Sequence, residues 1–260
     1  MYETNFHKAA TAQEAAALLN TCEDGRVLAG GQTLIPTMKQ RLADPTDVID
    51  ISAAADLRGI TIAGNEVTIG AMTTHAEVAG HAALAALCPS ICKLAANIGD
   101  PAVRHRGTIG GSLANNDPAA DYPAAALALN ARIHTTSREI AADDFFQGMF
   151  TTALDEDEII TAVSFTAPAK GGYGKFPNPA SRYAMAGVFV AKLADGSVRV
   201  AVTGASEDGV HRHDGLEAAL SADWSASAVD GVAISSDGLL SGFSADVAKT
   251  WDYSLSIGSA

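Results

Sequence analysis

The most informative absences in this sequence are those of the standard motifs for nucleotides, metals and nucleophilic catalysis. The chain contains no G-x-G-x-x-G, no G-x-x-x-x-G-K-[ST], no G-x-S-x-G and no H-E-x-x-H. These motifs indicate, in turn, a Rossmann dinucleotide site, a P-loop, a serine hydrolase and a zinc protease. The sequence therefore offers no motif support for any of these four classes.

Basic residues and cysteines are also scarce. The chain has 17 Lys+Arg against 30 Asp+Glu, for a formal net charge of -13. Nucleic acids and anionic membranes are bound by clustered Lys and Arg, so neither is expected as a partner. The three cysteines, Cys22, Cys88 and Cys92, are too few and too irregular for a disulfide framework. We expect buried structural thiols and no metal site or iron–sulfur cluster of the chain's own.

Long apolar runs are missing as well. The best candidate, residues 82–96, contains Pro89 and Lys93 and indicates a buried helix rather than a membrane span. The first residues, MYETNFHKAA, lack the basic and apolar regions of a signal peptide. We therefore expect a cytoplasmic protein without a transmembrane segment.

What is present is a mixture of helical and strand patterns. Thr11 followed by Glu14 predicts a capped helix over 11–20. Strands at 26–29 and 48–51 with a helix at 34–42 complete a first α/β lobe, residues 1–53. The second lobe, 54–167, is expected to begin with a hairpin that turns at Gly64-Asn65, followed by helices at 74–80 and 82–97. An irregular stretch at 99–123 then leads into a short apolar helix or turn at 123–130. A solvated acidic turn at 155–158 and a strand at 159–163 complete this lobe.

A third unit is expected from residue 168 to residue 260. The Gly-rich segment 167–174 indicates a boundary before it. Strands predicted at 184–193, 198–203 and 232–234 give this unit a small sheet.

Two glycine pairs are the strongest candidates for a binding site. Gly30-Gly31 stands between Ala29 and Gln32-Thr33, and Gly110-Gly111 stands between Thr108-Ile109 and Ser112. We interpret both as turns whose consecutive backbone N–H groups and hydroxyls bind anions, the first also opening a helix. Either pair alone could be an ordinary turn. Two pairs about eighty residues apart fit a ligand with two phosphates.

Polar residues follow the second pair in ANNDPAAD. Asn115, Asn116, Asp117 and Asp121 could bind the hydroxyls or the polar ring edge of such a ligand. The alternative is a loop that uses Asn and Asp for Asx-turns.

These segments carry a family resemblance. AGGQTLIPTMKQRL (29–42) and RGTIGGSLANNDPAADYPAAALALN (106–130) resemble the FAD-binding middle subunit of molybdenum hydroxylases. They are most similar to the medium subunits of aerobic carbon monoxide dehydrogenases, and xanthine dehydrogenases contain the same module. The likeness spans about residues 5–205. It implies an α+β fold of the vanillyl-alcohol-oxidase (PCMH) type, with two α/β lobes and a small C-terminal antiparallel sheet-and-helix domain.

The resemblance also implies the cofactor, FAD, and its contacts. Asp121 would hydrogen-bond FAD, Ile160 would pack against the isoalloxazine, and Lys175 would lie near the N1/C2 edge of the ring. A cation at that edge would stabilise the anionic reduced flavin. In the first motif, Ala29, Gly30, Gly31, Gln32 and Thr33 would bind the pyrophosphate region, with Leu28 and Leu34 packing nearby. In the second motif, Thr108, Gly110, Gly111 and Ser112 would hold phosphate and ribityl oxygens.

The implied function is electron transfer, with no catalytic side chain. Electrons would come from a molybdopterin-binding large subunit through a two-iron two-sulfur small subunit, in a heterotrimer expected to dimerise. FAD in this chain would pass them to an external acceptor. Two alternatives stay open: a self-sufficient FAD reductase of the enolpyruvyl-reductase type, and a non-enzymatic module that has lost FAD.

Overall fold

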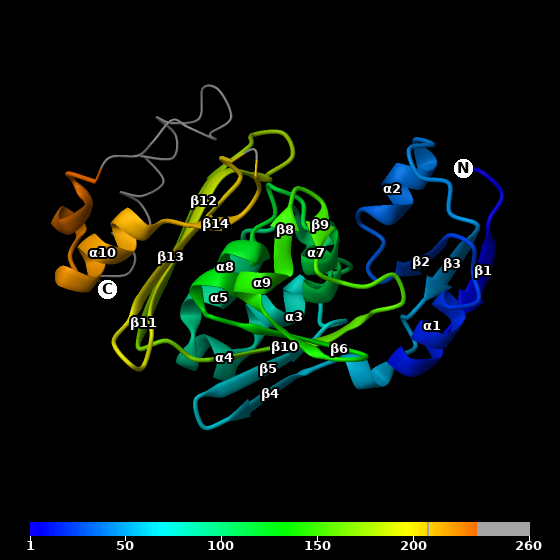
Figure 1. The fold of residues 1–260 in the computed structure, drawn as a ribbon, viewed down its shortest axis with the longest axis horizontal. Helices are drawn as coiled ribbons and strands as arrows, with labels where there is room; N and C mark the ends of the chain where they lie inside the picture. The colour runs from blue at the N-terminus through cyan, green and yellow to red at the C-terminus, as the bar shows by residue number, and fades with distance from the viewer. Residues whose placement is uncertain (207, 233–260) are drawn as a thin grey trace.

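A computed structural model of the chain describes residues 1–206 and 208–232 (Figure 1). Three successive parts of the sequence each form a sheet, of three, five and four strands, and a two-stranded ribbon is added to the second part. In Figure 1 the three-stranded sheet lies at the right, the five-stranded sheet below the centre and the four-stranded sheet at the left. None of the helices in the described residues is long and apolar enough to cross a membrane.

The first sheet is parallel, in the order β1-β3-β2. Its helix α1 starts where predicted, because the Thr11 side chain accepts a hydrogen bond from the N–H of Glu14. The strand at the N-terminus was not predicted, and the helix predicted at 34–42 ends at Lys39. The elements are β1 (Asn5–Lys8), α1 (Ala12–Leu19), β2 (Gly25–Leu28), α2 (Leu34–Lys39) and β3 (Asp47–Asp50).

The second sheet is antiparallel, in the order β4-β5-β10-β6-β7. The hairpin predicted around Gly64-Asn65 is confirmed: Gly64 has φ +63°, which favours glycine in a two-residue turn. The strands are β4 (Ile60–Ala63), β5 (Glu66–Gly70), β6 (Arg132–Thr135), β7 (Glu139–Ala141) and β10 (Ile160–Thr166), with the ribbon β8 (Phe146–Gly148) and β9 (Thr151–Thr152).

Helices pack above this second sheet, and two predictions about them were wrong. The single helix expected at 82–97 breaks at Cys88, because Pro89 cannot continue a helix but can begin one. The stretch 99–123 is not irregular: Asp100 and Thr108 cap two short helices within it. The helices are η1 (Ala55–Leu57), α3 (His75–Gly80), α4 (Ala82–Leu87), α5 (Pro89–Ala96), α6 (Pro101–Arg104), α7 (Ile109–Asn115), α8 (Tyr122–Ala128) and α9 (Ala142–Phe145).

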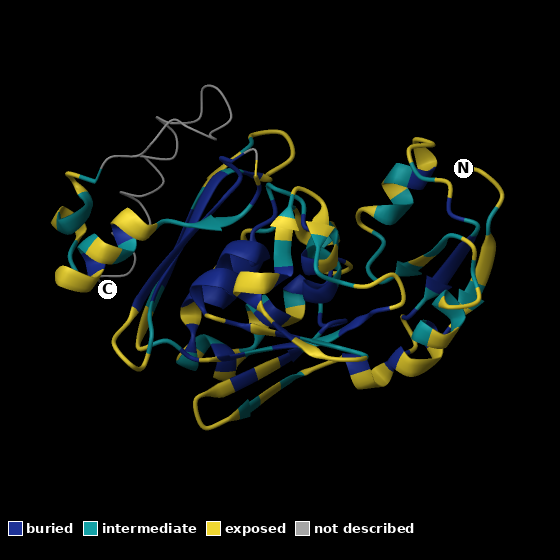
Figure 2. Ribbon diagram, viewed as in Figure 1, coloured by how far each residue is buried: buried dark blue, intermediate teal, exposed yellow. Residues whose placement is uncertain are grey.

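The third sheet is antiparallel, in the order β11-β12-β13-β14, and both of its faces are covered. Phe189 and Ala191 of β12 join the core that includes α5 and α8, whereas Val188 and Val190 pack with Leu216 of α10. Figure 2 shows this burial as dark blue along β12, β13 and α8. The elements are β11 (Lys170–Pro177), β12 (Ala184–Lys192), β13 (Val198–Thr203), β14 (His211–Arg212), α10 (Asp214–Ala222) and η2 (Ala226–Val229).

The predicted strands at 184–193 and 198–203 are confirmed by β12 and β13. The segment 167–174, predicted as a boundary, already contains the first half of β11. The strand predicted at 232–234 falls largely outside the described residues, and Val232 itself is in no strand. The unit boundaries at 53/54 and 167/168 remain predictions.

Candidate functional site

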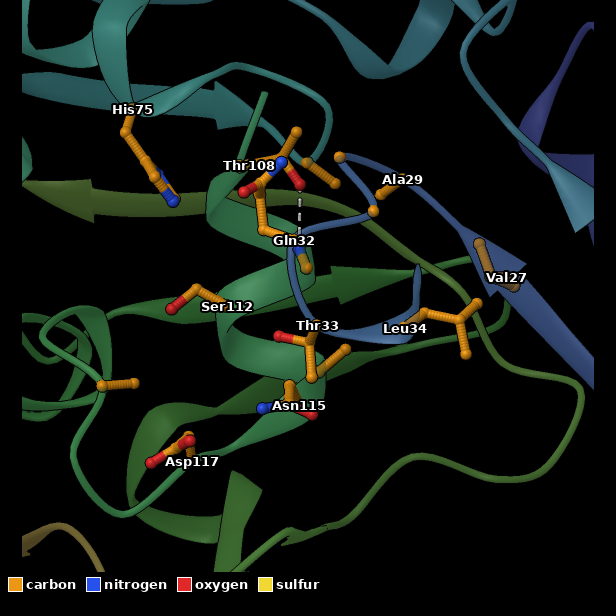
Figure 3. Close-up of a pocket in the computed structure, with 18 of the residues that line it drawn as sticks. Val27, Ala29, Gln32, Thr33, Leu34, His75, Thr108, Ser112, Asn115 and Asp117 are labelled. Carbon is orange, nitrogen blue, oxygen red and sulfur yellow. Dashed lines mark hydrogen bonds between the residues drawn. The ribbon is translucent and has the colours of Figure 1, made fainter. Parts of the chain in front are cut away.

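A pocket of about 640 Å³ lies between the loop that follows β2 and helix α7. Figure 3 shows Thr33 and Leu34 on the first of these segments, and Ser112 and Asn115 on the second. Leu28 and Lys175, which were predicted as site residues, do not line it. The predicted residues that do line it are Ala29, Gly30, Gly31, Gln32, Thr33, Leu34, Thr108, Gly110, Gly111, Ser112, Asp121 and Ile160.

The loop after β2 supplies unpaired backbone donors. Among the described residues, no acceptor bonds the N–H groups of Gly30, Gly31, Gln32 or Thr33. Gly31 has φ +71°, a conformation that glycine adopts without strain. The Thr33 hydroxyl makes no capping hydrogen bond either. Consecutive free N–H groups of this kind form a concavity that binds anions.

Helix α7 is different, and this corrects the prediction of two similar turns. Gly110 and Gly111 lie in the first turn of the helix, and the Thr108 hydroxyl accepts the N–H of Gly111 at 3.2 Å. The N–H of Ile109 donates to Thr73 O at 3.2 Å, and that of Gly110 donates to Ala71 O at 2.9 Å. Because these donors already have protein partners, the second motif offers the pocket its Ser112 hydroxyl and a close-packed surface instead of free N–H groups.

The glycines are required by contacts within the protein. A Cβ on Gly30 would lie 2.0 Å from the carbonyl oxygen of Arg106, and one on Gly110 would lie 2.6 Å from Ala71 Cβ. Gly111 is less restricted: its Cβ would meet the Thr108 side chain (Oγ1) at 3.0 Å and the Ala29 Cβ, across the pocket, at 3.8 Å. Glycine at positions 30 and 110 therefore lets the surrounding segments approach one another.

Asp121 lies at the inner end of the pocket and is 4% exposed. Tyr173 donates its hydroxyl to Asp121 Oδ1 at 2.5 Å, and Lys175 Nζ lies 2.9 Å from Oδ1 and 3.0 Å from Oδ2. Burial raises the pKa of Asp121, and the Lys175 ammonium opposes this rise. Lys175 therefore affects the pocket by pairing with Asp121, while its own side chain lines a second pocket.

Asn116 has a structural role that its sequence position did not reveal. It is in the left-handed conformation at the end of α7, with φ +41°. Its side-chain amide donates to Gly148 O at 2.7 Å and to Thr151 O at 2.8 Å, which fixes the β8–β9 ribbon. Its neighbours Asn115 and Asp117 line the pocket.

Several lining residues escaped the sequence analysis. His75 is buried, and among the described residues its Nδ1 has no hydrogen-bond partner. Burial, with a smaller contribution from Arg104, lowers the pKa of His75 to about 4, so the ring is neutral at pH 7. Tyr183 is 44% exposed beside the pocket. The only sequence signal for His75 was the capping box of Thr74 and Glu77, which makes His75 the first residue of α3.

The acidic turn predicted at 155–158 is not solvated throughout, because Glu158 is buried. It is 7% exposed, lines the pocket and pairs with Arg138 at 2.8 Å. The Arg138 guanidinium, with help from Ser137, lowers the pKa of Glu158 to about 2. Only its neighbours 155–157 are exposed.

The cysteines are free thiols, and Cys88 and Cys92 are buried as predicted. Cys22 is half-buried and lies near His7 and Asp47, with potential ligand atoms within 4.8 Å of one another. His7 Nε2 and Asp47 Oδ1 already form a hydrogen bond of 2.7 Å.

Known proteins share both the sequence and the structure of this chain. The nicotine 6-hydroxylase medium subunit of Paenarthrobacter nicotinovorans is 40% identical over 75% of this chain and 72% of its own length. The carbon monoxide dehydrogenase medium chain of Afipia carboxidovorans is 40% identical over 74% of this chain and 69% of its own. The structure matches reconstituted CO dehydrogenase from Oligotropha carboxidovorans with a TM-score of 0.88 and 30% identity, covering 99% of this chain and 98% of the other.

Residues 2–168 match the model of the FAD binding domain in molybdopterin dehydrogenase. The resemblance, the fold type and the FAD cofactor inferred from the two glycine motifs are thereby confirmed. This chain belongs to the FAD-binding family of the molybdopterin dehydrogenases and is a flavoprotein subunit of an oxidoreductase.

Proposed function

We propose that this chain is the electron-transfer subunit of a molybdenum hydroxylase, in which FAD takes electrons from iron–sulfur clusters of a partner and passes them to an external acceptor. The observation that carries the proposal is the run of free N–H groups from Gly30 to Thr33, which faces α7 across a pocket. Gly30 and Gly31 are half-buried and Gln32 and Thr33 are exposed, so these donors are open to acceptor oxygens of a bound ligand, and consecutive free N–H groups form a concavity that binds anions. The pyrophosphate of FAD supplies such acceptors.

The remaining pocket residues would orient the cofactor. The Ser112 and Thr33 hydroxyls add neutral donors to the anion site, and Asn115 and Asp117 fit hydroxyl groups farther along α7. Ile160 provides an apolar wall. Asp121, fixed by Tyr173 and Lys175, offers a polar edge whose position is set by two hydrogen bonds. FAD itself supplies the redox chemistry; the protein binds it, orients it and tunes its potential.

The partners we propose are a molybdopterin-binding large subunit and a two-iron two-sulfur small subunit, in a heterotrimer that dimerises. Its relatives include medium subunits and medium chains, whose names indicate larger and smaller companions. A cytoplasmic location is part of the same proposal.

The test is to purify the chain alone and with its partner subunits and to measure flavin content by visible absorption. We expect one FAD per chain in the complex, reduced when substrate is added and reoxidised by an acceptor. An assembled complex without flavin would refute the proposal. Turnover by the isolated chain with a reduced nicotinamide nucleotide would instead favour the self-sufficient reductase.

A further inference from the structure

A second pocket, of about 730 Å³, lies where the end of α5 meets β11 and the loop that follows β11. Among the described residues that line it, four are cationic and none is acidic. In a chain with 17 Lys+Arg against 30 Asp+Glu, such a concentration of positive charge is unexpected by chance. The cations are Lys93, Arg104, Lys175 and Arg182.

Only one of these four charges is neutralised. Lys175 pairs with Asp121, whereas Lys93, Arg104 and Arg182 have no carboxylate partner among residues 1–206 and 208–232. Like charges held together in one pocket repel one another unless an anion joins them. The pocket therefore carries unbalanced positive charge in a protein that is acidic overall.

Backbone carbonyls just after α5 hold the guanidinium groups in position. Arg104 Nη1 donates to Ile98 O at 2.9 Å and to Gly99 O at 3.0 Å, and Arg182 Nη1 donates to Gly99 O at 3.4 Å. These carbonyls belong to the loop between α5 and α6, and bonding to them accounts for part of the cluster. These bonds use one nitrogen of each guanidinium, however, and the other N–H groups have no acceptor in the described part of the chain.

We infer that this pocket binds a small molecule bearing phosphate groups. Fixed guanidinium forks with a nearby ammonium are suited to phosphate oxygens. The two pockets share Gly99 and Arg182, so a bound anion would lie directly beside the FAD site. This assignment rests on the proposed function: the anion is the external electron acceptor. Its phosphate is held by Lys93, Arg104 and Arg182, and its redox-active part faces the FAD pocket near Tyr183.

The direct test is calorimetric titration of inorganic pyrophosphate into the full FAD-loaded chain, in which FAD already fills the first pocket. Lys93 lines the second pocket and not the first, and its side chain makes no hydrogen bond or ion pair with the described residues, so K93Q is the decisive variant. We expect K93Q and R182Q each to weaken pyrophosphate binding about two- to fivefold, and the double variant more. K170Q, which removes an exposed charge at the far end of β11, should leave binding unchanged.

Acceptor kinetics of the complex give a second measurement. K93Q should raise the KM for a phosphate-bearing acceptor and leave the KM for an uncharged acceptor as it was. The inference fails if pyrophosphate does not bind the wild type, or binds K93Q, K170Q and wild type alike, which would mean an adventitious ion only. Flavin absorption of each protein distinguishes the failure of one proposal from that of the other. A wild-type complex that binds no FAD refutes the proposed function. A normal FAD content, with pyrophosphate binding unchanged by K93Q, refutes only the anion site.

Discussion

The carbonyl oxygen of Arg106 lies 2.0 Å from the place where a Cβ on Gly30 would stand. The loop after β2 thus rests directly on the backbone that leads into α7, and the two glycine motifs, far apart in the sequence, meet at this contact. Gly107 continues it: a Cβ there would lie 2.5 Å from His75 Nε2. The shape of the FAD pocket depends on this backbone contact between two segments of the same chain.

Gly30→Ala should therefore push the loop away from Arg106. Overpacking of this kind costs about 1–3 kcal/mol of unfolding free energy, and we expect FAD retention to fall with it. Urea unfolding and flavin absorption measure the two effects. Gly80→Ala is the matched control, because no atom lies within 4 Å of its Cβ position. If G30A unfolded like G80A and kept its FAD, the contact would not matter.

Gly111→Asp tests the pocket with a smaller steric conflict, because its Cβ would lie 3.0 Å from the Thr108 side chain and would not enter a backbone carbonyl. Its side chain would enter the space between α7 and Ala29, bringing negative charge close to the expected pyrophosphate. An acidic residue in the first turn of a helix is compatible with folding. We expect FAD affinity to fall at least about tenfold, equivalent to about 1.4 kcal/mol, with circular dichroism unchanged. Gly111→Ala controls for the added Cβ, and equal FAD binding by G111D and G111A would contradict the assignment.

Lys175→Met should be strongly destabilising, because it leaves the Asp121 carboxylate buried without its cation. Breaking a buried pair in this way costs about 3–5 kcal/mol. Tyr173→Phe removes one hydrogen bond to the same carboxylate and should cost about 1.5–3 kcal/mol. Denaturant unfolding measures these losses of unfolding free energy. The control is Lys170→Met, which replaces an exposed lysine on the same strand and should cost far less.

A double variant checks the cause. Asp121→Asn combined with Lys175→Met removes both charges, so it should recover part of the stability that K175M loses. No recovery would mean that Lys175 acts through its packing and not through Asp121.

The lowered pKa of Glu158 makes the unfolding free energy of the protein depend on pH in the acid range. Its folded-state pKa of about 2 lies below the ordinary value of 4.5, so its stabilising effect is complete above pH 4.5 and is lost as the pH falls toward 2. The difference between these two pKa values corresponds to about 3 kcal/mol. Glu158→Gln should lower the unfolding free energy at pH 7 by this order and flatten its decline between pH 4.5 and 2. Glu156→Gln, at an exposed neighbouring position, should retain the wild-type profile.

Local signals in the sequence predicted many elements correctly. Gly64-Asn65 fixed the hairpin because a tight turn needs a positive φ, and Thr11 fixed the start of α1 because its side chain accepts an N–H bond. The strand at 198–203 was predicted with the bounds that β13 has. Gly and Asn around 99–116 concealed two helices, because the Asp100 and Thr108 caps outweigh the low helix propensity of these residues.

By itself, the sequence determined the family and the cofactor, and most of the site residues predicted from it line the pocket, because the two glycine motifs are local patterns. Only the tertiary structure decided how those residues are used. The N–H groups of Gly110 and Ile109 are paired because Ala71 and Thr73 lie beside them, while those of Gly30 and Gly31 have no such neighbour in the described part of the chain. Asp121 pairs with Lys175, and Lys93 and Arg182 come to line one pocket, only once the chain has folded. Hydrogen-bond saturation and charge balance depend on neighbours distant in the chain, and only the folded chain brings those neighbours into contact.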